Sequence, residues 1–277
     1  QSFFLTICVF WLIFANKNEK IYIIIDGKRG ILMTQNILSQ LETAINNSNY
    51  TVALCGSGCL KECGLYELKS QEHAYAIESK YGISPEYLYT SAYYSSRPKQ
   101  FFDFYKNELL TPENPPSPTS LALAAMEKKG KLNFTITSNI FNFPQRAGCK
   151  NVINLHGHIY NNYCTTCGHN HSVEYIKNSD SIPLCEKCGR AIRPGVSFFG
   201  DMVDNALITK AIEEIEKSEL LLLLGTTLRS EVFHHFLNHF NGHTLAIIHE
   251  DEDVSDKNAD IVIYSQPKKV FHELGYI

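Results

Sequence analysis

The chain has 277 residues, of which 44% are hydrophobic and 19% charged, as in an ordinary globular protein with one large or two modest domains. The net charge of −4 and a pI near 6.3 argue against a positive electrostatic potential over the whole protein. Neither nucleic acid nor a membrane is therefore expected as a partner. The odd number of cysteines, nine, does not fit a secreted disulfide scaffold and favours the reducing cytoplasm.

The first 32 residues are considered apart from the rest. Ser2 to Ala15 is almost wholly apolar, but it is shorter than the ~20 residues that a membrane-spanning helix needs. It also lacks the basic start and cleavage site of a signal peptide. Met33 follows Gly27-Lys28-Arg29-Gly30, whose codons can be purine-rich like a ribosome-binding site. We therefore expect residues 1–32 to be non-native upstream sequence or a disordered extension, with a peripheral anchor as the alternative.

From Met33 onward the chain alternates between helices and short strands. Apolar residues at helical spacing predict a helix over residues 35–47, and Thr51 to Leu54 is typical of a buried strand leading into a glycine turn. Further helices are expected within residues 70–110 and at 119–128 and 204–217, and further strands at 133–137, 220–224, 244–248 and 261–264. This alternation predicts parallel βαβ units and therefore an α/β fold, with a Rossmann-like sheet flanked by helices.

Two cysteine pairs interrupt the alternation. Cys164 and Cys167 form one pair, Cys185 and Cys188 the other, with 17 residues between the pairs. Four thiolates at this spacing can close around one tetrahedral zinc ion, and the glycine after each pair permits the tight turn of a zinc knuckle. Because such a site has no open position, we expect it to be structural. Two nearby histidines are surplus to this ligand set and are interpreted as surface residues: His169 and His171.

Gly56-Ser57-Gly58 follows the first predicted strand of this domain. Glycine at this place lets backbone amides approach a pyrophosphate, and the N-terminus of a following helix favours the anion. The pattern is only half of a dinucleotide fingerprint, and by itself it is often no more than a turn. Its context decides the interpretation.

Six segments, in chain order from about residue 35 to residue 275, resemble motifs of the sirtuin family. They are the glycine-rich NAD loop at residues 55–65, the T-Q-N-I-D segment with its downstream R-A-G at 137–148, the L-H-G motif at 154–157, the R-P-x-V-V-x-F-G-E segment at 193–201, the G-T-S-L turn at 224–228 and the A-D-x-V-I strand at 259–263. Any one match could arise by chance. Six in the right order around the cysteine pairs do not, so the chain is identified as a member of this family.

The resemblance implies a catalytic domain over residues 33–277 with two parts. The Rossmann-like part would comprise about residues 33–68, 119–157 and 194–277. A smaller inserted domain would combine a helical part at about residues 69–118 with a zinc ribbon at about 158–193.

The resemblance also implies NAD-dependent removal of acyl groups from lysine side chains of a protein or peptide, releasing nicotinamide and O-acyl-ADP-ribose. His156 would be the base that deprotonates a ribose hydroxyl, and Asn139 would hold the water or carboxamide in the nicotinamide pocket. Residues expected to contact NAD are Gly56, Ser57, Gly58, Lys69, Ser138, Asn139, Gly225, Thr226, Thr227 and His249. Residues expected to contact the acyl-lysine peptide, which would add as a strand, are Val196, Phe199 and Gly200.

The sequence departs from the family pattern at three places, and the first two fall at the nicotinamide pocket, so they weaken deacylation more than NAD binding. Tyr66-Glu67-Leu68-Lys69 replaces P-D-F-R, so a covering phenylalanine is missing and Lys69 lacks the planar donors of arginine. Phe141 replaces the aspartate of T-Q-N-I-D, and His249 replaces an asparagine on the adenosine side. Two alternatives therefore stay open: a mono-ADP-ribosyltransferase or NAD glycohydrolase, and a non-catalytic NAD or ADP-ribose binding module.

The preferred acyl group is not determined by the sequence. Tyr94 and Arg97 have the spacing with which some family members bind acidic acyl chains, but Tyr105 and Glu108 form a rival alignment. The simpler interpretation of both pairs is aromatic packing. Three cysteines in the glycine loop are interpreted as small buried residues, with a redox-sensitive pocket as the alternative: Cys55, Cys59 and Cys63.

Overall fold

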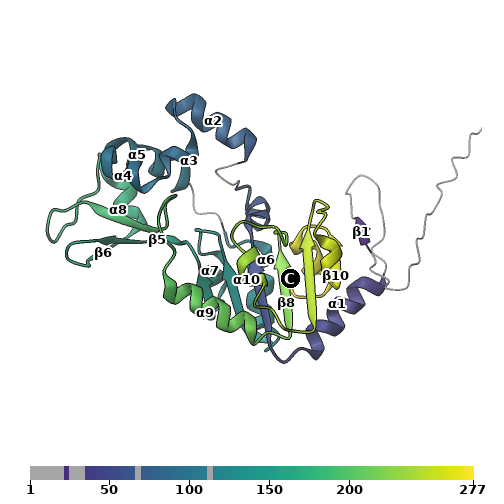
Figure 1. Cartoon of the computed structure of the whole chain (residues 1–277). Helices are drawn as coiled ribbons and strands as arrows, with labels where there is room; N and C mark the ends of the chain where they lie inside the picture. Colours follow the sequence, from purple (N-terminus) through teal and green to yellow (C-terminus); the bar gives the residue numbers. More distant parts are fainter. Residues whose placement is uncertain (1–21, 25–34, 66–69, 111–114) are drawn as a thin grey trace, which may run out of the picture.

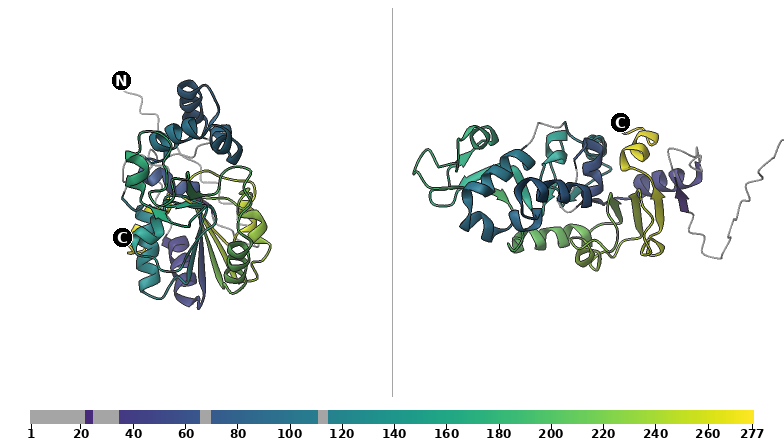
Figure 2. Two further views of the ribbon diagram at one scale, coloured as in Figure 1. Left: turned by 90° about the vertical axis from the view of Figure 1, so that its left-hand side faces the viewer. Right: turned by 90° about the horizontal axis from the view of Figure 1, so that it is seen from above.

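The computed structural model describes residues 22–24, 35–65, 70–110 and 115–277, and they form two lobes (Figure 1). The larger lobe is built on a parallel sheet with helices on both faces. The smaller lobe combines short helices with a three-stranded antiparallel sheet (Figures 1 and 2). The expected α/β fold class, a Rossmann-like parallel sheet with a smaller inserted part, is confirmed.

The strands of the large sheet have the order β1-β10-β9-β8-β2-β3-β4, and every neighbouring pair is parallel. They are β1 (Tyr22–Ile24), β2 (Thr51–Cys55), β3 (Phe134–Thr137), β4 (Val152–Asn154), β8 (Leu220–Leu224), β9 (Thr244–His249) and β10 (Ile261–Tyr264). Strand order reverses beside β2, with β3 and β4 on one side and β8 to β10 on the other. Such a switch point places a crevice outside the carboxyl ends of the strands.

Both faces of the sheet are buried, and β8 shows how one strand serves both. Alternate side chains of a strand point to opposite faces, so Leu220, Leu222 and Leu224 enter one core and Leu221 and Leu223 the other. Helices α1 (Gln35–Asn47), α6 (Pro118–Lys128) and α11 (Pro267–Glu273) contribute to the first core. Helices α9 (Asn205–Glu216) and α10 (His234–Leu237) pack on the second. A strand buried on both sides is therefore wholly apolar.

The smaller lobe has an aromatic core of its own. Its helices are α2 (Gln71–Tyr81), α3 (Pro85–Leu88), α4 (Ser91–Ser96), α5 (Pro98–Phe104), the π-helix η2 (Tyr105–Leu109) and α8 (Val173–Asn178). Its sheet has the order β6 (Asn170–His171), β5 (Gly157–Cys164) and β7 (Ile192–Val196). Phe101 and Tyr105 share one core with Cys164 and Cys185, so the helical segment and the cysteine module fold against each other. This core extends to Phe198, past the boundary expected near residue 193.

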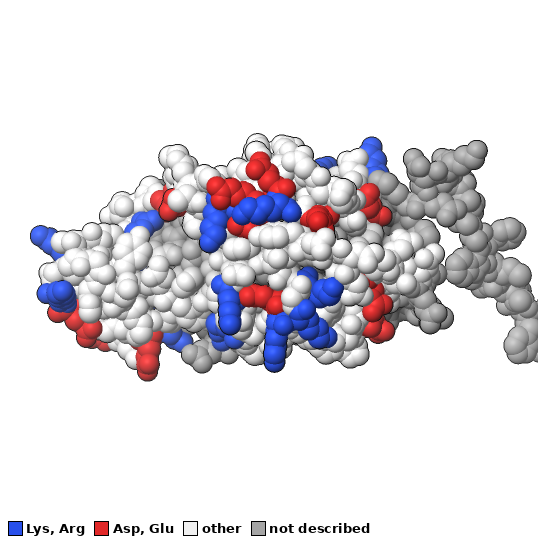
Figure 3. Space-filling model, turned by 90° about the horizontal axis from the view of Figure 1, so that it is seen from below, with Lys and Arg blue, Asp and Glu red and all other residues white. Residues whose placement is uncertain are grey.

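Three smaller elements complete the described chain: η1 (Ser57–Cys63), α7 (Phe143–Ala147) and η3 (Asp256–Asn258). Strand β1 lies within the segment interpreted as upstream sequence and pairs with β10, Tyr22 opposite Val262. The rest of residues 1–34, and residues 66–69 with Lys69, lie outside the described residues. Among the described helices, none has the length and apolar character needed to cross a bilayer. On the face drawn in Figure 3, basic and acidic side chains are interspersed over the larger lobe.

Candidate active site

Two adjoining cavities, each of about 480 Å³, lie at the carboxyl ends of the parallel strands. Both are lined by Ser57, Thr226 and Ser230, so they form one groove with two ends. One end reaches over β9 to His249, and the other reaches His156 and the smaller lobe. Each end has the size of an ordinary small-molecule site, and together they suit an elongated ligand.

The floor of the groove is a backbone contact between η1 and the loop after β8. Gly56 N–H donates to Leu224 O and Gly58 N–H donates to Gly225 O, each at 2.9 Å. A Cβ on Gly58 would lie 2.7 Å from Gly225 Cα, and Gly225 has a φ of 59°. Because a side chain would separate the two loops or strain the backbone, glycine is required at both places.

Three other amides at this floor remain available to a ligand. The N–H groups of Ser57, Thr226 and Thr227 have no acceptor in the described part of the chain, and all three residues line the groove. The sequence predicts that the glycine amides approach the pyrophosphate, but those of Gly56 and Gly58 are used to join the loops. The donors for an anion are therefore the residues beside the glycines, at the N-terminus of η1 and after β8.

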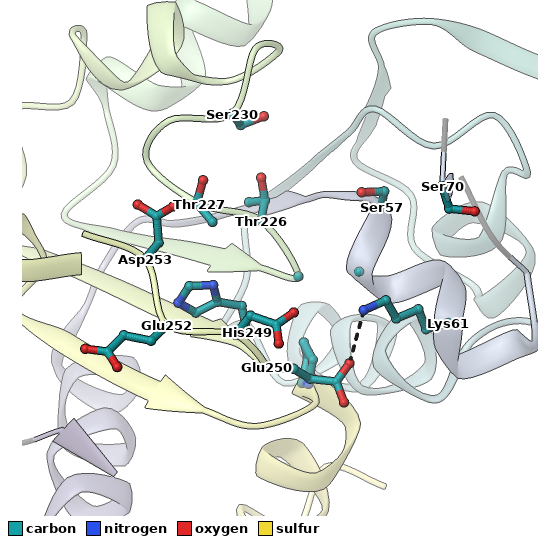
Figure 4. Close-up of a pocket in the computed structure, with 14 residues that line it drawn as sticks. Ser57, Lys61, Ser70, Thr226, Thr227, Ser230, His249, Glu250, Glu252 and Asp253 are labelled. Carbon is teal, nitrogen blue, oxygen red and sulfur yellow. Dashed lines mark ion pairs between the residues drawn. The ribbon is translucent and has the colours of Figure 1, made fainter. Parts of the chain in front are cut away.

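His249 lines the first end of the groove, and its ring is fixed from behind. Its Nε2 lies 3.1 Å from Asp256 Oδ2, and the Tyr264 hydroxyl donates to the same oxygen at 3.0 Å. Because this carboxylate is buried, the imidazole cannot turn without losing its partner. Lys61 and Glu250 face each other across the opening, 3.7 Å apart (Figure 4).

Sequence reasoning missed the acidic segment that borders this end, Glu250 to Asp253. Ser255, and then Arg229 at 2.8 Å, hold the pKa of Asp253 at about 2 by hydrogen bonding to its charged form. The signal was present in the sequence, because residues directly after a parallel strand such as β9 reach the crevice.

Asn139 and His156 stand at the other end, after β3 and β4. Asn139 Nδ2 donates to Gly56 O at 2.9 Å, which ties this residue to the floor and leaves its side-chain oxygen for other partners. The His156 carbonyl accepts from Ser197 N–H at 2.9 Å, while its imidazole has no hydrogen-bond partner in the described chain. Burial lowers the pKa of His156, so the ring is neutral at pH 7 and can accept a proton. Ser138 lines the same end.

Phe141 occupies the place where the resemblance expects an aspartate. Its ring stacks on Phe143, with centroids 5.7 Å apart and planes at 19°, and it lines the groove near His156. The wall at this end is largely apolar. Its other apolar residues are Leu60, Tyr89, Leu109, Ile140, Phe198, Phe199, Val203 and Val232.

Of the residues predicted to contact the acyl-lysine, Phe199 and Gly200 line the groove, but Val196 does not. Val196 is only 4% exposed and packs in the aromatic core of the smaller lobe. Alternation along β7 explains this placement, since Ile192 and Val196 stand at alternate positions and both belong to that core.

Neither pair considered for acyl preference lines the groove. The Tyr94 hydroxyl donates to Ile192 O at 3.2 Å, and Glu108 accepts from Lys80 at 2.7 Å. Tyr89 and Leu109 provide the wall instead, and no local pattern in the helical segment distinguishes them from its many other apolar residues.

The four paired cysteines converge at one point of the smaller lobe. Sγ of Cys164 lies 3.4 Å from that of Cys188, and Sγ of Cys167 lies 3.6 Å from that of Cys185. Tetrahedral zinc with Zn–S bonds of about 2.3 Å separates its sulfurs by about 3.8 Å, so the four thiols can hold a zinc ion. Each knuckle closes by a bond from its glycine N–H to the first cysteine carbonyl, at 2.9 and 2.8 Å.

Two of the three cysteines in the glycine loop are buried in the larger lobe, and the third is half-buried. Cys55 and Cys59 are buried, and the Cys59 thiol donates to Leu224 O at 3.5 Å. A hydrogen bond from Cys55, then burial, raise the pKa of Cys59, and burial raises that of Cys63 to about 11. Thiols with raised pKa values are poor nucleophiles at neutral pH.

Fold and site together define an α/β protein with a nucleotide-type groove at a sheet switch point and a separate four-cysteine centre. A model of the Sir2 family matches residues 56–232. An NAD-dependent protein deacetylase of Clostridium perfringens is 33% identical over 234 residues, which cover 84% of this chain and 96% of that protein. The chain belongs to the Sir2, or sirtuin, family.

Solved structures agree with this assignment. A complex of a Sir2 homologue with NAD is 27% identical and superimposes with a TM-score of 0.74, covering 85% of this chain and 91% of the other. A Sir2 protein bound to an acetylated peptide is 25% identical, with a TM-score of 0.72 over 86% of this chain and 96% of the other.

Proposed function

We propose that the chain is an NAD-dependent protein-lysine deacylase that transfers an acyl group, in the first place acetyl, from lysine to ADP-ribose. The observation that carries this proposal is the meeting of three features at one groove. These are the amides of Ser57, Thr226 and Thr227, the amide side chain of Asn139, and the neutral, unpaired imidazole of His156. A purely nucleotide-binding module would not need the last of these.

The groove residues fit NAD in both charge and shape. The amides of Ser57, Thr226 and Thr227 would bind the pyrophosphate, and His249, held by Asp256, would contact the adenosine part. Gly56, Gly58 and Gly225 would act by keeping the two loops in contact. NAD, when bound, supplies the ribose carbon and hydroxyl that take up the acyl group as nicotinamide leaves.

His156 would act as general base toward a ribose hydroxyl, since burial keeps its imidazole neutral. Asn139, tied to Gly56 O, would orient the water or the carboxamide beside it. Phe199 and Gly200 would contact the substrate, with the peptide adding as a strand between the lobes. The four paired cysteines would hold one structural zinc ion.

We infer a preference for uncharged acyl chains. The groove near His156 is walled by Tyr89, Leu109 and Phe198, and an acidic acyl chain would lose its hydration there without gaining a charged partner. A cytoplasmic location is part of the same proposal, because buried free thiols and a zinc-type cysteine set suit a reducing compartment.

The test measures nicotinamide release from NAD by the full chain with acetyl-, butyryl- and succinyl-lysine peptides. We expect peptide-dependent release that yields O-acyl-ADP-ribose and is slowest with succinyl-lysine. His156→Ala should lose about 10²–10⁴-fold in rate. His158→Ala is the matched control, since this histidine is also half-buried but does not line the groove.

Other outcomes would replace the proposal. Release without peptide, with free ADP-ribose or a modified protein as product, would indicate a glycohydrolase or an ADP-ribosyltransferase. NAD binding without any release would indicate a non-catalytic module.

A further inference from the structure

The burial of His171 contradicts the interpretation of this histidine as a surface residue. Its side chain is only 1% exposed, whereas His169 is exposed. The Nε2 atom of His171 is buried without a hydrogen-bond partner, and its Nδ1 lies 3.7 Å from Glu186 Oε2, too far for a hydrogen bond. A buried polar ring without a partner is unfavourable, so this histidine calls for an explanation that packing does not give.

The surroundings hold the ring in place. The ring of Tyr175 lies against that of His171, with centroids 5.0 Å apart and planes at 31°, and the Tyr175 hydroxyl donates to Leu184 O at 2.7 Å. On the backbone side His171 belongs to β6 and pairs with Asn162 of β5. The ring is therefore held in place by packing on α8 and by the pairing of β6 with β5.

Two further side chains of types that can bind metals lie close to it. One ring nitrogen each of His169 and His171 and one carboxylate oxygen of Glu186 lie within 4.8 Å of one another. These side chains are distinct from the four cysteines, which form a cluster of their own. Two imidazoles and one carboxylate are a ligand set used by zinc sites with an open fourth position.

We propose that His169, His171 and Glu186 form a second metal site, which binds a divalent transition-metal ion of the zinc, nickel or copper class. Imidazole ligands select these ions over magnesium and calcium, which prefer oxygen. Zinc bonds of about 2.0–2.1 Å bring the three ligand atoms to about 3.4 Å from one another. The buried ring stays fixed, and the exposed His169 and Glu186 side chains move to close the site.

Bound metal at this place would link the two cysteine knuckles. His169 follows the first knuckle, and Glu186 stands between Cys185 and Cys188 of the second. The site lies in the β6 and α8 region, at the end of the smaller lobe remote from the large sheet (Figure 1). The inference is therefore independent of the catalytic proposal, and its test needs no activity measurement.

The experiment counts zinc bound to the full chain by mass spectrometry of the metal and by titration against a chromophoric chelator. We expect two equivalents per chain, of which a weak chelator removes one. His169→Ala and Glu186→Gln should each keep the first equivalent and weaken the second by about 100-fold or more, since even an outer-shell change can cost that much. His243→Ala, which removes an exposed histidine elsewhere, should keep both.

Cobalt separates the two sites by their colour. The first equivalent bound to the cysteines should give intense thiolate absorption, and the second should add only weak visible bands. Because His169 and Glu186 are exposed, their variants should fold and retain the thiolate signal. One equivalent in the unchanged chain, or two tight equivalents in both variants, would overturn the proposal.

Discussion

Burial sets the protonation state of His156. The ring lies at the groove between the lobes, where removal from water disfavours its charged form and lowers its pKa. The neutral imidazole that a base requires is therefore present at pH 7 and persists below the ordinary value of about 6.5.

The pH dependence of kcat/KM follows from this direction. Activity should stay level as the pH falls from about 8 to about 6.5, and decline only below it, as the lowered pKa is passed and the ring takes up a proton. A pH profile with acetyl-lysine peptide measures this, with NAD binding followed over the same range as control. An acid limb centred above pH 7 would show that the base has a raised pKa and is not this histidine.

Phe141 lines the groove at the place where the family resemblance leads one to expect an aspartate. Phe141→Asp restores the carboxylate that the family resemblance leads one to expect in the nicotinamide pocket. A hydrogen bond to a charged group contributes about 1.5–3 kcal/mol, so inhibition by nicotinamide should strengthen about 10-fold or more. Phe141→Ala is the control, because it removes the ring stacked on Phe143 without adding a carboxylate. Equal inhibition of both variants would contradict this role.

At the scale of elements, the contact between η1 and the loop after β8 forms the floor of the groove. It can be tested by Gly225→Ala, whose Cβ would lie 2.7 Å from Cys59 N. Gly130→Ala is the matched control, because Gly130 has a similar φ of 69° but no neighbour within 4 Å. A left-handed backbone costs about 1–2 kcal/mol of stability in either variant. Any further loss of stability in Gly225→Ala therefore reports the crowding around its Cβ.

We expect Gly225→Ala to lower the Tm further than Gly130→Ala, by about 2–4 °C for each extra kcal/mol. It should also weaken NAD binding, because Thr226 shifts with the loop. Calorimetry measures both quantities. Equal Tm values and unchanged NAD affinity would mean that the loops do not depend on this close approach.

Elements were predictable to different degrees. Five consecutive leucines fix β8 at residues 220–224, because only a short apolar run bounded by turns fits a strand buried on both faces. The helix at residues 35–47 was predicted with its bounds, from its periodic apolar face. β4 was missed, since three residues give no periodicity and the strand exists only through its pairing with β3.

At the scale of the whole molecule, the lobes have separate cores and share the groove. Removing zinc with a strong chelator should loosen the smaller lobe, because its cysteines belong to the same core as Phe101 and Tyr105. Hydrogen exchange should accelerate in β5 and β7 while β2 and β8 stay protected. Peptide turnover should be lost with the wall formed by Tyr89 and Leu109, whereas NAD binding should largely remain. Simultaneous loss of protection in both lobes would show a single cooperative unit instead.

The sequence by itself determined what depends on local order. The zinc-type cluster followed from the spacing of four cysteines, Cys164, Cys167, Cys185 and Cys188. The class of fold followed from the alternation of helical segments with short apolar strands. Motif order identified the family. These features are local because knuckle turns, strands and helices are set by residues a few positions apart.

Only the tertiary structure decided which groups are buried, paired or free. The amides of Gly56 and Gly58 join two loops, and Val196 packs in the core of the smaller lobe. His171 is buried, and its Nε2 has no hydrogen-bond partner. The tertiary structure also brought Tyr89 from a helical segment to the groove. Burial and pairing depend on segments far apart in the chain, so no local pattern records them, and they set the chemistry of each site through desolvation and available donors.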